Sequence, residues 1–300
     1  MRHTFPVLFG LLLSFTAKNN VASACATFMP PGRTDLPVPN VEEALIVYDD
    51  ATQTERFVRR ASFGAGTGPF GFVVPTPSRP TLGEAKEGLF EKLHELVDAP
   101  PPRAKGSRSV GGDGALPAAA VAPVQVVEDK RVAGMDATVI VATDATALIA
   151  WLAAHGFAMP EASRPWVARY IEQKWVFTAF KFVPPNNKAP MHIGAVELKF
   201  KTATPIYPYA EPTGLAANPS RRLKLWVLSD KPRSFTMMDT HQVASTIVRS
   251  HSKVVSFPER LLPGEAPRKR TLDYFVDAAA SRPMVDVELP AALKATAASP

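Results

Sequence analysis

The histidines of this chain, and the acids near them, are the residues best suited to chemistry. Imidazole changes its charge near neutral pH, so histidine serves in acid–base catalysis and in metal binding. His241 and His251 approach each other if the residues between them form a hairpin, with Asp239 as a third group. This group would suit a metal or an acid–base reaction, and the alternative is a pair of ordinary surface histidines. The other histidines beyond residue 24, none of which has a partner at the spacing of one helical turn, are His94, His155 and His192.

Other catalytic patterns are missing from the sequence. No G-x-S-x-G nucleophile elbow occurs, and Cys25 is the only cysteine. Residues 66–71 fit the dinucleotide fingerprint G-x-G-x-x-G, but the fingerprint needs a helix next and residues 72–74 are typical of a strand. Asp286 and Glu288 would share one face of a strand, which suggests acid–base chemistry only beside a cleft. The sequence therefore predicts no catalytic residue, no cofactor and no metal site.

The start of the chain has the three-part pattern of an export signal. Arg2 and His3 form a short polar start, residues 5–15 are apolar, and residues 22–24 read Ala-Ser-Ala. The apolar run is shorter than the roughly 20 residues that cross a bilayer. We therefore expect residues 1–24 to be a signal peptide that is cleaved between Ala24 and Cys25.

Cys25 leaves two alternatives open for the mature N-terminus. Ordinary cleavage would release a soluble periplasmic or extracellular protein, whereas acylation of the Cys25 thiol would anchor a lipoprotein to the membrane. Residues 21–25 resemble a lipobox, but Ala22 stands where leucine is usual and residues 18–20 form a polar insert, which favours the soluble form. Because there is no second cysteine, the fold has no internal disulfide and must rely on its core.

The charge of the chain is mild and scattered. The 300 residues carry a formal net charge of +6, which falls to +4 when Arg2 and Lys18 leave with the signal peptide. The two basic clusters, at 103–108 and 268–270, are flanked by proline or glycine, and a nucleic-acid surface would need a denser stripe with interleaved aromatic residues. We therefore expect no nucleic-acid partner, and we expect no transmembrane helix in the mature chain.

The elements that must position these residues begin with a β-rich lobe over residues 25–98. Strand-like segments occur at 44–48, 56–63 and 70–74. Thr81 and Glu84 then match a capping box before apolar residues at helical spacing, which predicts a helix over 82–97. Residues 99–120 are rich in proline and glycine, so they predict a linker or a long surface loop.

A second lobe, with both helices and strands, is expected over residues 121–230. Asp144 and Ser163 are the predicted N-caps of its two helices. Tyr207 and Tyr209, framed by prolines, are candidates for an exposed contact surface, with edge packing as the alternative. Its strands are expected at 123–128, 131–142, 175–183, 193–201 and 222–228, with a turn at 129–130.

Residues 231–300 are expected to form a C-terminal extension with short strands at 235–238 and 253–257 and a frayed tail. Strands and helices come in blocks along the whole chain rather than in strict alternation. This arrangement favours an α+β fold, with mixed or antiparallel β-sheets in two lobes and about three helices that cover one face.

Several segments, taken in order, resemble the bacterial family catalogued as domain of unknown function 2330. The resemblance spans about residues 25–230 and implies a shared fold, export and, for some relatives, a membrane anchor, but no assigned activity. Relatives carry further cysteines near the start and in the glycine-rich loop, which this chain lacks. The segments that carry the resemblance are Cys25 after the export signal, residues 43–49, 72–80 and 151–157, Tyr170-Ile171 with Trp175, and residues 205–208.

Together these observations predict an exported bacterial cell-envelope protein that acts by binding or as a structural module. Two alternatives stay open. One is a hydrolase of envelope polymers that uses Asp239, His241 or His251. The other is a periplasmic binder of small molecules or metals, which would need a pocket lined by aromatic residues.

Overall fold

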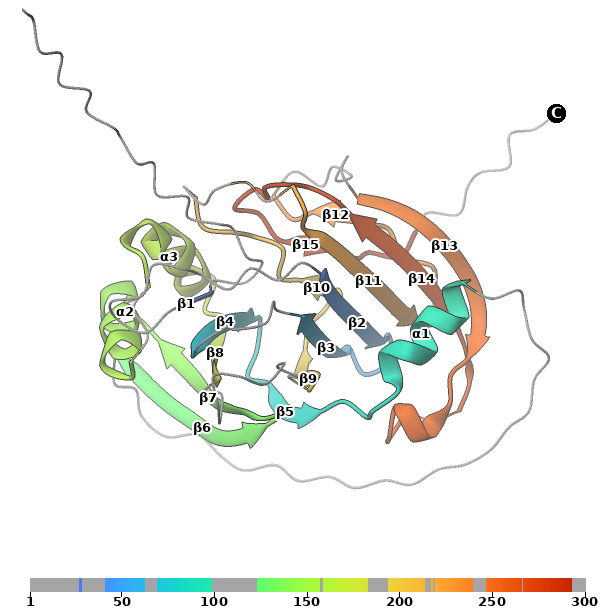
Figure 1. The fold of residues 1–300 in the computed structure, drawn as a ribbon, viewed down its shortest axis with the longest axis horizontal. Helices are drawn as coiled ribbons and strands as arrows, with labels where there is room; N and C mark the ends of the chain where they lie inside the picture. The colour runs from blue at the N-terminus through green and yellow to red at the C-terminus, as the bar shows by residue number, and fades with distance from the viewer. Residues whose placement is uncertain are drawn as a thin grey trace, which may run out of the picture.

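Three β-sheets, built from most of the apolar segments, form the body of the protein (Figure 1). The structure is a computed structural model. No helix among the described residues is both long and apolar enough to span a membrane. The described residues are 27–28, 41–62, 69–98, 123–156, 159–182, 194–213, 217, 219–239, 247–265 and 267–292.

The largest sheet has seven strands, with β2 at its centre. Residues 44–47 of β2 are almost fully buried because both faces of the strand are covered, which explains their continuous apolar run. β2 pairs in parallel with β11, and all other neighbours are antiparallel. The strand order is β13 (Ile247–Ser256), β14 (Lys269–Asp277), β11 (Arg222–Ser229), β2 (Val41–Asp49), β3 (Thr54–Ser62), β9 (Val196–Lys201) and β5 (Thr81–Glu84).

A five-stranded antiparallel sheet and a small three-stranded sheet complete the β structure. The five-stranded sheet has the order β1 (Thr27–Phe28), β4 (Phe70–Thr76), β8 (Val176–Phe182), β7 (Met135–Ala142) and β6 (Val124–Val132). The three-stranded sheet has the order β10 (Ile206–Tyr207), β15 (Val287–Glu288) and β12 (Thr236–Met237).

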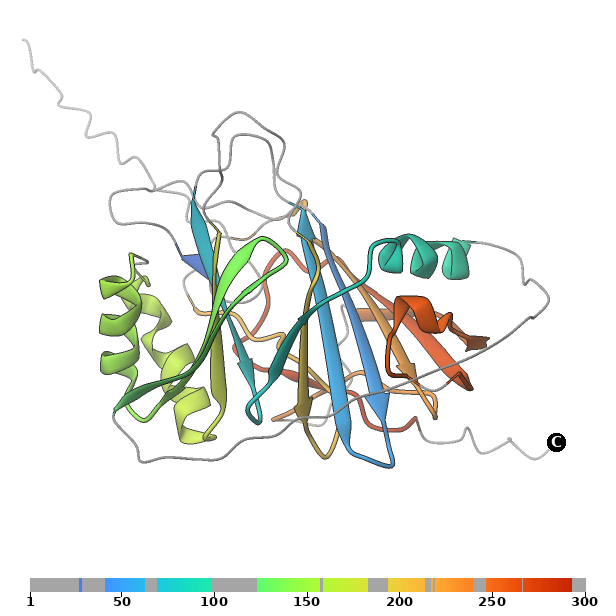
Figure 2. The ribbon, with the colours of Figure 1, turned by 90° about the horizontal axis from the view of Figure 1, so that it is seen from below.

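Three helices cover two different sides of this body. α2 (Ala145–Ala154) and α3 (Arg164–Glu172) lie beside the five-stranded sheet, whereas α1 (Leu89–Asp98) lies at the far side of the seven-stranded sheet (Figure 2). The expectation that the helices share one face was therefore wrong. Two 3-10 turns, Glu161–Ser163 and Glu259–Leu261, complete the helical elements of the described residues.

The hydrophobic core has two parts because the seven-stranded sheet is buried on both faces. On its inner face Ile46 and Phe57 belong to a large cluster that includes Phe72 and Phe180 of the five-stranded sheet. On its outer face a second cluster forms beneath α1, around Trp226. The strand pattern of the sequence is therefore explained by burial, and the predicted α+β class with mixed and antiparallel sheets is confirmed.

The helix predicted over 82–97 begins too early. Residues 81–84 form the edge strand β5, where Leu82 faces Leu198 of β9 and is buried. The Glu84 carboxylate accepts a hydrogen bond from the Ala133 backbone N–H at 2.5 Å instead of closing a capping box. Gly88, with φ at +79°, reverses the chain before α1 begins at Leu89.

The turn predicted at 129–130 lies four residues further along. β6 continues to Val132, and the hairpin turns at Ala133 and Gly134, whose φ angles are +50° and +80°. Two consecutive residues with positive φ match the twist of the flanking strands in a tight hairpin. The sequence signal at Asp129-Lys130 was therefore misread as the turn, because charged residues also occupy the solvent side of an edge strand.

Strands from different predicted lobes pair with one another in the same sheet. The seven-stranded sheet takes β2, β3 and β5 from residues 25–98, β9 and β11 from 121–230, and β13 and β14 from 231–300. The division into lobes stays a prediction. Residues 1–24, Cys25 and the linker at 99–120 lie outside the described residues.

Candidate functional site

Of the three residues singled out for metal or acid–base chemistry, the two that the structure describes contact different partners. The Asp239 carboxylate, just after β12, forms an ion pair with Arg169 of α3 at 3.1 Å. His251 lies on β13, where its ring contacts the Tyr274 ring at 6.1 Å between centroids. His241 lies outside the described residues. Within the described part of the chain, no group of three or more His, Cys, Asp or Glu side chains is arranged to hold a metal ion.

Tyr207 and Tyr209 do not form an exposed surface. Both are buried, at 0% and 1% exposure; Tyr207 lies on β10 and Tyr209 lies two residues after it. Edge packing, the stated alternative, describes them better: the ring of Tyr207 packs against Phe57 and that of Tyr209 against Phe235. The buried Tyr209 hydroxyl donates a hydrogen bond to the Asp277 carboxylate at 3.0 Å.

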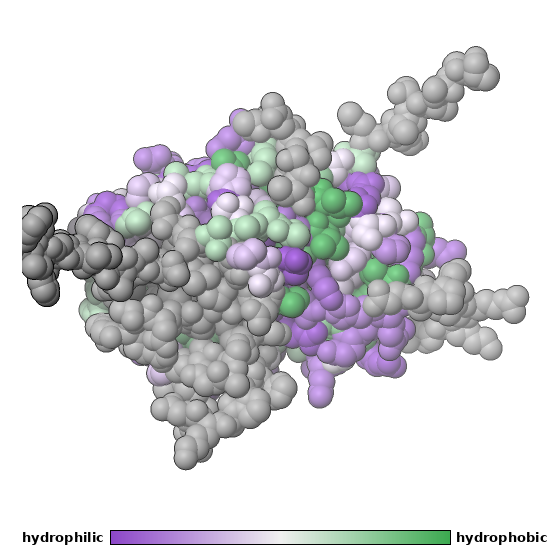
Figure 3. Space-filling view, turned by 45° about the horizontal axis from the view of Figure 1, so that its top comes forward, coloured by the Kyte–Doolittle hydropathy of each residue, from purple (hydrophilic) through white to green (hydrophobic). Residues whose placement is uncertain are grey.

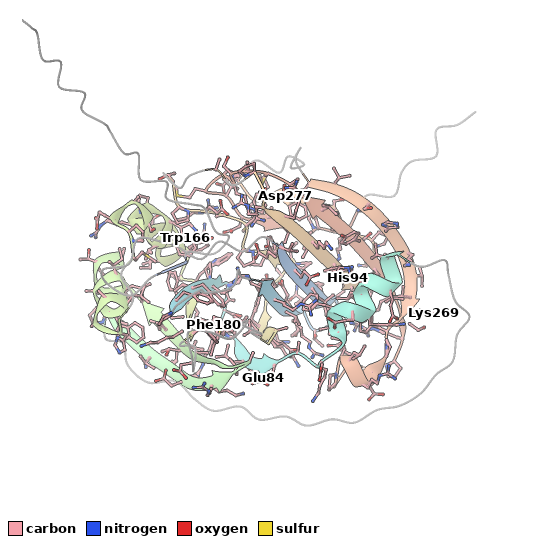
Figure 4. All side chains as sticks on the ribbon, in the orientation of Figure 1. Glu84, His94, Trp166, Phe180, Lys269 and Asp277 are labelled. Atoms are coloured by element: carbon pink, nitrogen blue, oxygen red, sulfur yellow. The ribbon has the colours of Figure 1, made fainter. Side chains whose placement is uncertain are left out.

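Charged side chains are buried on the inner face of the seven-stranded sheet, and the sequence did not reveal them. The Glu42 carboxylate accepts from Arg59 at 2.8 Å and pairs with Arg282 at 3.4 Å. Arg282 also pairs with Asp277, which lies at the end of β14 (Figure 4), at 3.4 Å. We call Glu42, Arg59, Asp277 and Arg282 the buried charge cluster. All four are at most 7% exposed.

The electrostatics of the buried charge cluster favour the ionised carboxylate. Burial alone raises the pKa of Glu42, but the charges of Arg59 and Arg282 outweigh it and lower that pKa to about 2. The Arg59 guanidinium lies 4.7 Å from the centre of the Phe72 ring of β4, and that of Arg282 lies 4.6 Å from the Tyr209 ring. The cluster therefore joins the seven-stranded sheet to β4 of the five-stranded sheet and to the segment that follows β10.

Other buried carboxylates have raised pKa values, in contrast to Glu42. Burial raises the pKa of Glu55 well above its usual value, since its only charge-stabilising contact is the Ile206 backbone N–H at 2.8 Å. Burial also raises the pKa of Asp286, which accepts from the Tyr170 hydroxyl at 2.9 Å. The acid–base chemistry suggested for Asp286 and Glu288 required a cleft beside them. The Asp286 side chain is fully buried, so it does not face such a cleft. Through these bonds Glu55 joins β3 to β10, and Asp286 joins the segment before β15 to α3.

A histidine–glutamate pair under α1 was also missed by the sequence analysis. His94 Nε2 lies 2.5 Å from Glu43 Oε1, and the same carboxylate binds Arg60 at 2.7 Å (Figure 4). The His94 ring packs edge-on against Trp226 at 5.0 Å. An oriented imidazole of this kind serves in catalysis when its other nitrogen faces a nucleophile. No Ser, Thr or Cys side chain bonds His94 within the described residues, so the pair is a structural contact between α1 and β2.

An open pocket of about 480 Å³ lies between the end of α2 and the five-stranded sheet. Its wall is the last turn of α2 and its floor is formed by β7 and β8. We call it the α2 pocket. Its volume is within the usual range of small-molecule sites. The lining side chains that matter for chemistry are Asp136, Thr138, Trp151, His155 and Lys181.

Local structure fixes the wall of the α2 pocket. The Asp144 side chain caps α2 through the Ala147 N–H at 2.7 Å, as predicted, and Gly156 ends it with φ at +86°. One turn apart, the rings of Trp151 and His155 stack with centroids 3.7 Å apart and an angle of 21° between planes. His155 Nδ1 lies 2.7 Å from the Trp151 carbonyl oxygen, which holds the imidazole in this position.

The floor of the pocket is set by strand register. Asp136 on β7 lies directly opposite Lys181 on β8, and Thr138 lies opposite Ala179 in the next row. Lys181 Nζ donates to the His155 carbonyl at 3.1 Å, so the floor and the wall are tied together. Asp136 accepts from Arg131 of β6 at 3.1 Å. The Thr138 hydroxyl donates to Asp129, not to a base in the pocket.

This arrangement suits binding better than catalysis. None of the described hydrogen bonds joins a nucleophile of the pocket to a general base, the arrangement that covalent catalysis requires. The pocket offers instead a flat aromatic surface beside a carboxylate, an ammonium group and a hydroxyl. Among the other surfaces, Figure 3 shows small hydrophobic areas scattered between hydrophilic ones. The large apolar side chains exposed in the described part are Val126, Val248 and Val254.

Comparisons with solved structures show weak likenesses only. The crystal structure of baculovirus P35 gives a TM-score of 0.40 at 9% identity, covering 84% of this chain and 96% of that chain. P35 in its complex with caspase-8 gives 0.37 at 7% identity, covering 83% and 95%. Likenesses at these scores carry no argument about this chain.

Sequence comparison gives a clearer result. No curated protein matches the chain. The model of a bacterial family described as "Uncharacterized protein conserved in bacteria (DUF2330)" matches residues 19–274, most of the sequence. The resemblance stated from the residues is thereby confirmed, and the chain belongs to this family of bacterial proteins.

Proposed function

We propose that this protein is an exported component of the bacterial cell envelope that acts as a non-catalytic binding module, with its ligand in the α2 pocket. The observation that supports binding is the pocket itself, where the stacked rings of Trp151 and His155 face the Asp136–Lys181 pair. Ligand sites are concave, mostly apolar and equipped with a few polar groups that fix orientation. The α2 pocket has this composition, and the buried charge cluster does not, because it is closed to solvent.

Export is supported by the sequence pattern of residues 1–24 and by the small residues before Cys25. The mature protein then either is soluble outside the cytoplasm or is held at a membrane by a lipid on Cys25. The intact mass of the protein purified from its native host separates these forms. An unmodified start at Cys25 would exclude the lipoprotein, an acylated Cys25 would exclude the soluble form, and retention of residues 1–24 would contradict export.

Tryptophan fluorescence offers a direct test of binding, because the four tryptophans differ in exposure. Trp166, Trp175 and Trp226 are at most 7% exposed, whereas Trp151 is half-buried in the pocket wall. Iodide should therefore quench Trp151 selectively, and a Trp151→Phe variant should lose most of the quenchable signal. A compound bound in the pocket should protect Trp151 from iodide and raise the melting temperature.

The screen for such a compound should cover sugars, amino acids, short peptides, organic acids and metal ions. Compounds that protect Trp151 in the wild type, with no thermal shift in a pocket variant such as Lys181→Met, would support the proposal. Lys199→Met is the matched control, because Lys199 is exposed on β9, away from the pocket. If no compound of any class protects Trp151 or shifts the melting temperature, the binding function is wrong.

A further inference from the structure

We propose that the α2 pocket binds a neutral saccharide, with the apolar face of a sugar ring against the aromatic wall and its hydroxyl groups on the polar floor. This inference rests on the proposed binding function and specifies the chemical class of its ligand. The juxtaposition that carries it is a stacked pair of aromatic rings beside an opposite-charge pair, within one open pocket of about 480 Å³.

The floor matches the hydrogen-bonding character of sugar hydroxyls. A hydroxyl both donates and accepts, so a saccharide site needs acceptors and donors close together. The Asp136 carboxylate only accepts and the Lys181 ammonium only donates, and the antiparallel register places them directly opposite each other. Thr138, in the next row along β7, adds an acceptor, since its hydroxyl hydrogen is donated to Asp129.

The aromatic wall of the pocket suits the apolar face of a sugar ring, which its C–H groups form. Trp151 and His155 stack face to face one helical turn apart, so each ring covers one face of the other and a sugar ring would pack against an uncovered face of this stacked pair. Leu152 packs behind them and is 2% exposed. The surface is rigid, since the Asp144 cap fixes the start of α2 and the Lys181 Nζ bond to the His155 carbonyl fixes its end.

Small residues leave room for a ring between the wall and the floor. Ala154, Gly156 and Ala179 line the pocket where larger side chains would fill it. A Cβ added at Gly156 would lie 3.7 Å from Lys181 Nζ, so even a methyl group there would contact the ammonium group of the floor.

Other ligand classes fit less well. An extended peptide binds by adding to a sheet edge, but β7 and β8 are internal strands whose neighbours are β6 and β4. A strongly charged ligand would need an excess of one sign, whereas the pocket lining carries one carboxylate, which Arg131 of β6 also binds, and one ammonium group. A neutral polyhydroxylated ring uses both groups and the aromatic surface together.

Saturation-transfer NMR on the full mature protein tests the inference. The probes are glucose, galactose, N-acetylglucosamine and the disaccharides cellobiose and chitobiose. Sorbitol is the matched control compound, because it has the hydroxyl groups without the rigid ring face. At least one cyclic saccharide should bind, with its C–H protons receiving the transferred signal, and sorbitol should bind at least about tenfold more weakly.

The binding affinities of variants then show whether the saccharide binds in the α2 pocket. His155→Ala, an exposed position, and Lys181→Met should each weaken binding by about tenfold, since each removes one recognition element. Lys199→Met and His251→Ala, which change the same residue types outside the pocket, should leave affinity within about twofold. Melting temperatures of all variants separate lost binding from lost folding.

The remaining outcomes are decisive. A saccharide that binds equally well to all pocket variants would place its site elsewhere and overturn the inference. A peptide, anion or metal ion that binds in a Lys181-dependent manner, with no saccharide binding, would keep the binding function and overturn the saccharide class. Absence of binding by every class would contradict the proposed function itself.

Discussion

Replacing Glu42 with glutamine should remove the charge that organises the buried charge cluster while keeping the shape of the side chain. In the folded protein the ionised carboxylate binds Arg59 at 2.8 Å and Arg282 at 3.4 Å, and its pKa is about 2 against an ordinary value of 4.5. A difference of one pKa unit corresponds to about 1.4 kcal/mol. Ionised Glu42 therefore contributes about 3 kcal/mol to the free energy of unfolding near neutral pH.

The sign of the pH dependence follows from the lowered pKa. Because the folded pKa lies below the unfolded one, the contribution is fully present above about pH 4.5. It is lost as the pH falls from there toward 2, where the carboxylate is protonated in both states. We thus expect Glu42→Gln to destabilise the protein by about 3 kcal/mol at pH 7 and at pH 5, and by much less at pH 3.

Urea unfolding of the wild type and the variant at pH 7, 5 and 3, followed by circular dichroism, measures this difference. Other carboxylates also titrate in this range, but their effects cancel in the difference between the two proteins. Glu95→Gln is the control, because Glu95 is 65% exposed and pairs with Lys92 on the surface of α1. It should change stability by less than about 0.5 kcal/mol at every pH.

A Glu42→Gln effect that is the same at all three pH values would refute the reasoning. The loss would then come from altered packing or hydrogen bonding, and the two arginines would not be stabilised by the carboxylate charge. An effect that grows as the pH falls would reverse the sign of the argument and would mean that Glu42 is protonated in the folded state near neutral pH.

Three further predictions concern stability. Glu55→Gln should flatten the wild-type profile above pH 4.5, because burial raises the pKa of Glu55 well above its ordinary value of 4.5 and the folded state takes up a proton before the unfolded state does. Urea unfolding should show the wild type gaining stability relative to the variant as the pH falls toward 4.5, by at most about 1.4 kcal/mol per pH unit. Asp144→Ala should lower the free energy of unfolding by about 1 kcal/mol, because the Asp144 side chain caps α2. Ser163→Ala should lower it by less than half as much, because the Ser163 side chain makes no capping bond to α3. Equal losses in the two variants would contradict the cap assignment. Gly134→Ala should cost about 1 kcal/mol in thermal unfolding, because φ is +80° there and no neighbouring atom lies near enough to compensate, so an unchanged melting temperature would argue against this turn geometry.

Strands and helices could be predicted from the sequence where burial requires apolar residues at regular positions. The apolar run of β2 and the Asp144 cap of α2 follow local rules, and the structure confirms them. Local rules failed at residues 81–84, because the pattern of Thr81 and Glu84 is compatible with a cap or with an edge strand. Pairing with β9, more than 110 residues away, decided the outcome.

The candidate site was harder to predict because it depends on register. Nothing near Asp136 indicates that Lys181 lies opposite, since that contact is set by the pairing of β7 with β8. From the sequence, His155 was noted as a histidine without a chemical partner one helical turn away, and Trp151 only as part of residues 151–157. The signal that could have linked them is their spacing of four residues on one helix, which brings two rings into contact.

The buried charges escaped prediction for a different reason: in a sequence, a charged residue is normally evidence of exposure. Their partners explain the exception. Glu42 of β2 and Arg282, 240 residues later, meet only if β2, β11 and β14 pair in the observed register. A slip of one residue would turn Glu42 outward and remove the carboxylate that binds both Arg59 and Arg282, leaving Asp277 as the carboxylate of the cluster. Buried ion pairs add little net stability compared with apolar packing, but unmatched buried charges are strongly unfavourable. We therefore expect the cluster to act mainly against wrong registers, so the loss in Glu42→Gln should appear together with a less cooperative urea transition. An unchanged urea m-value would assign the cluster to stability alone.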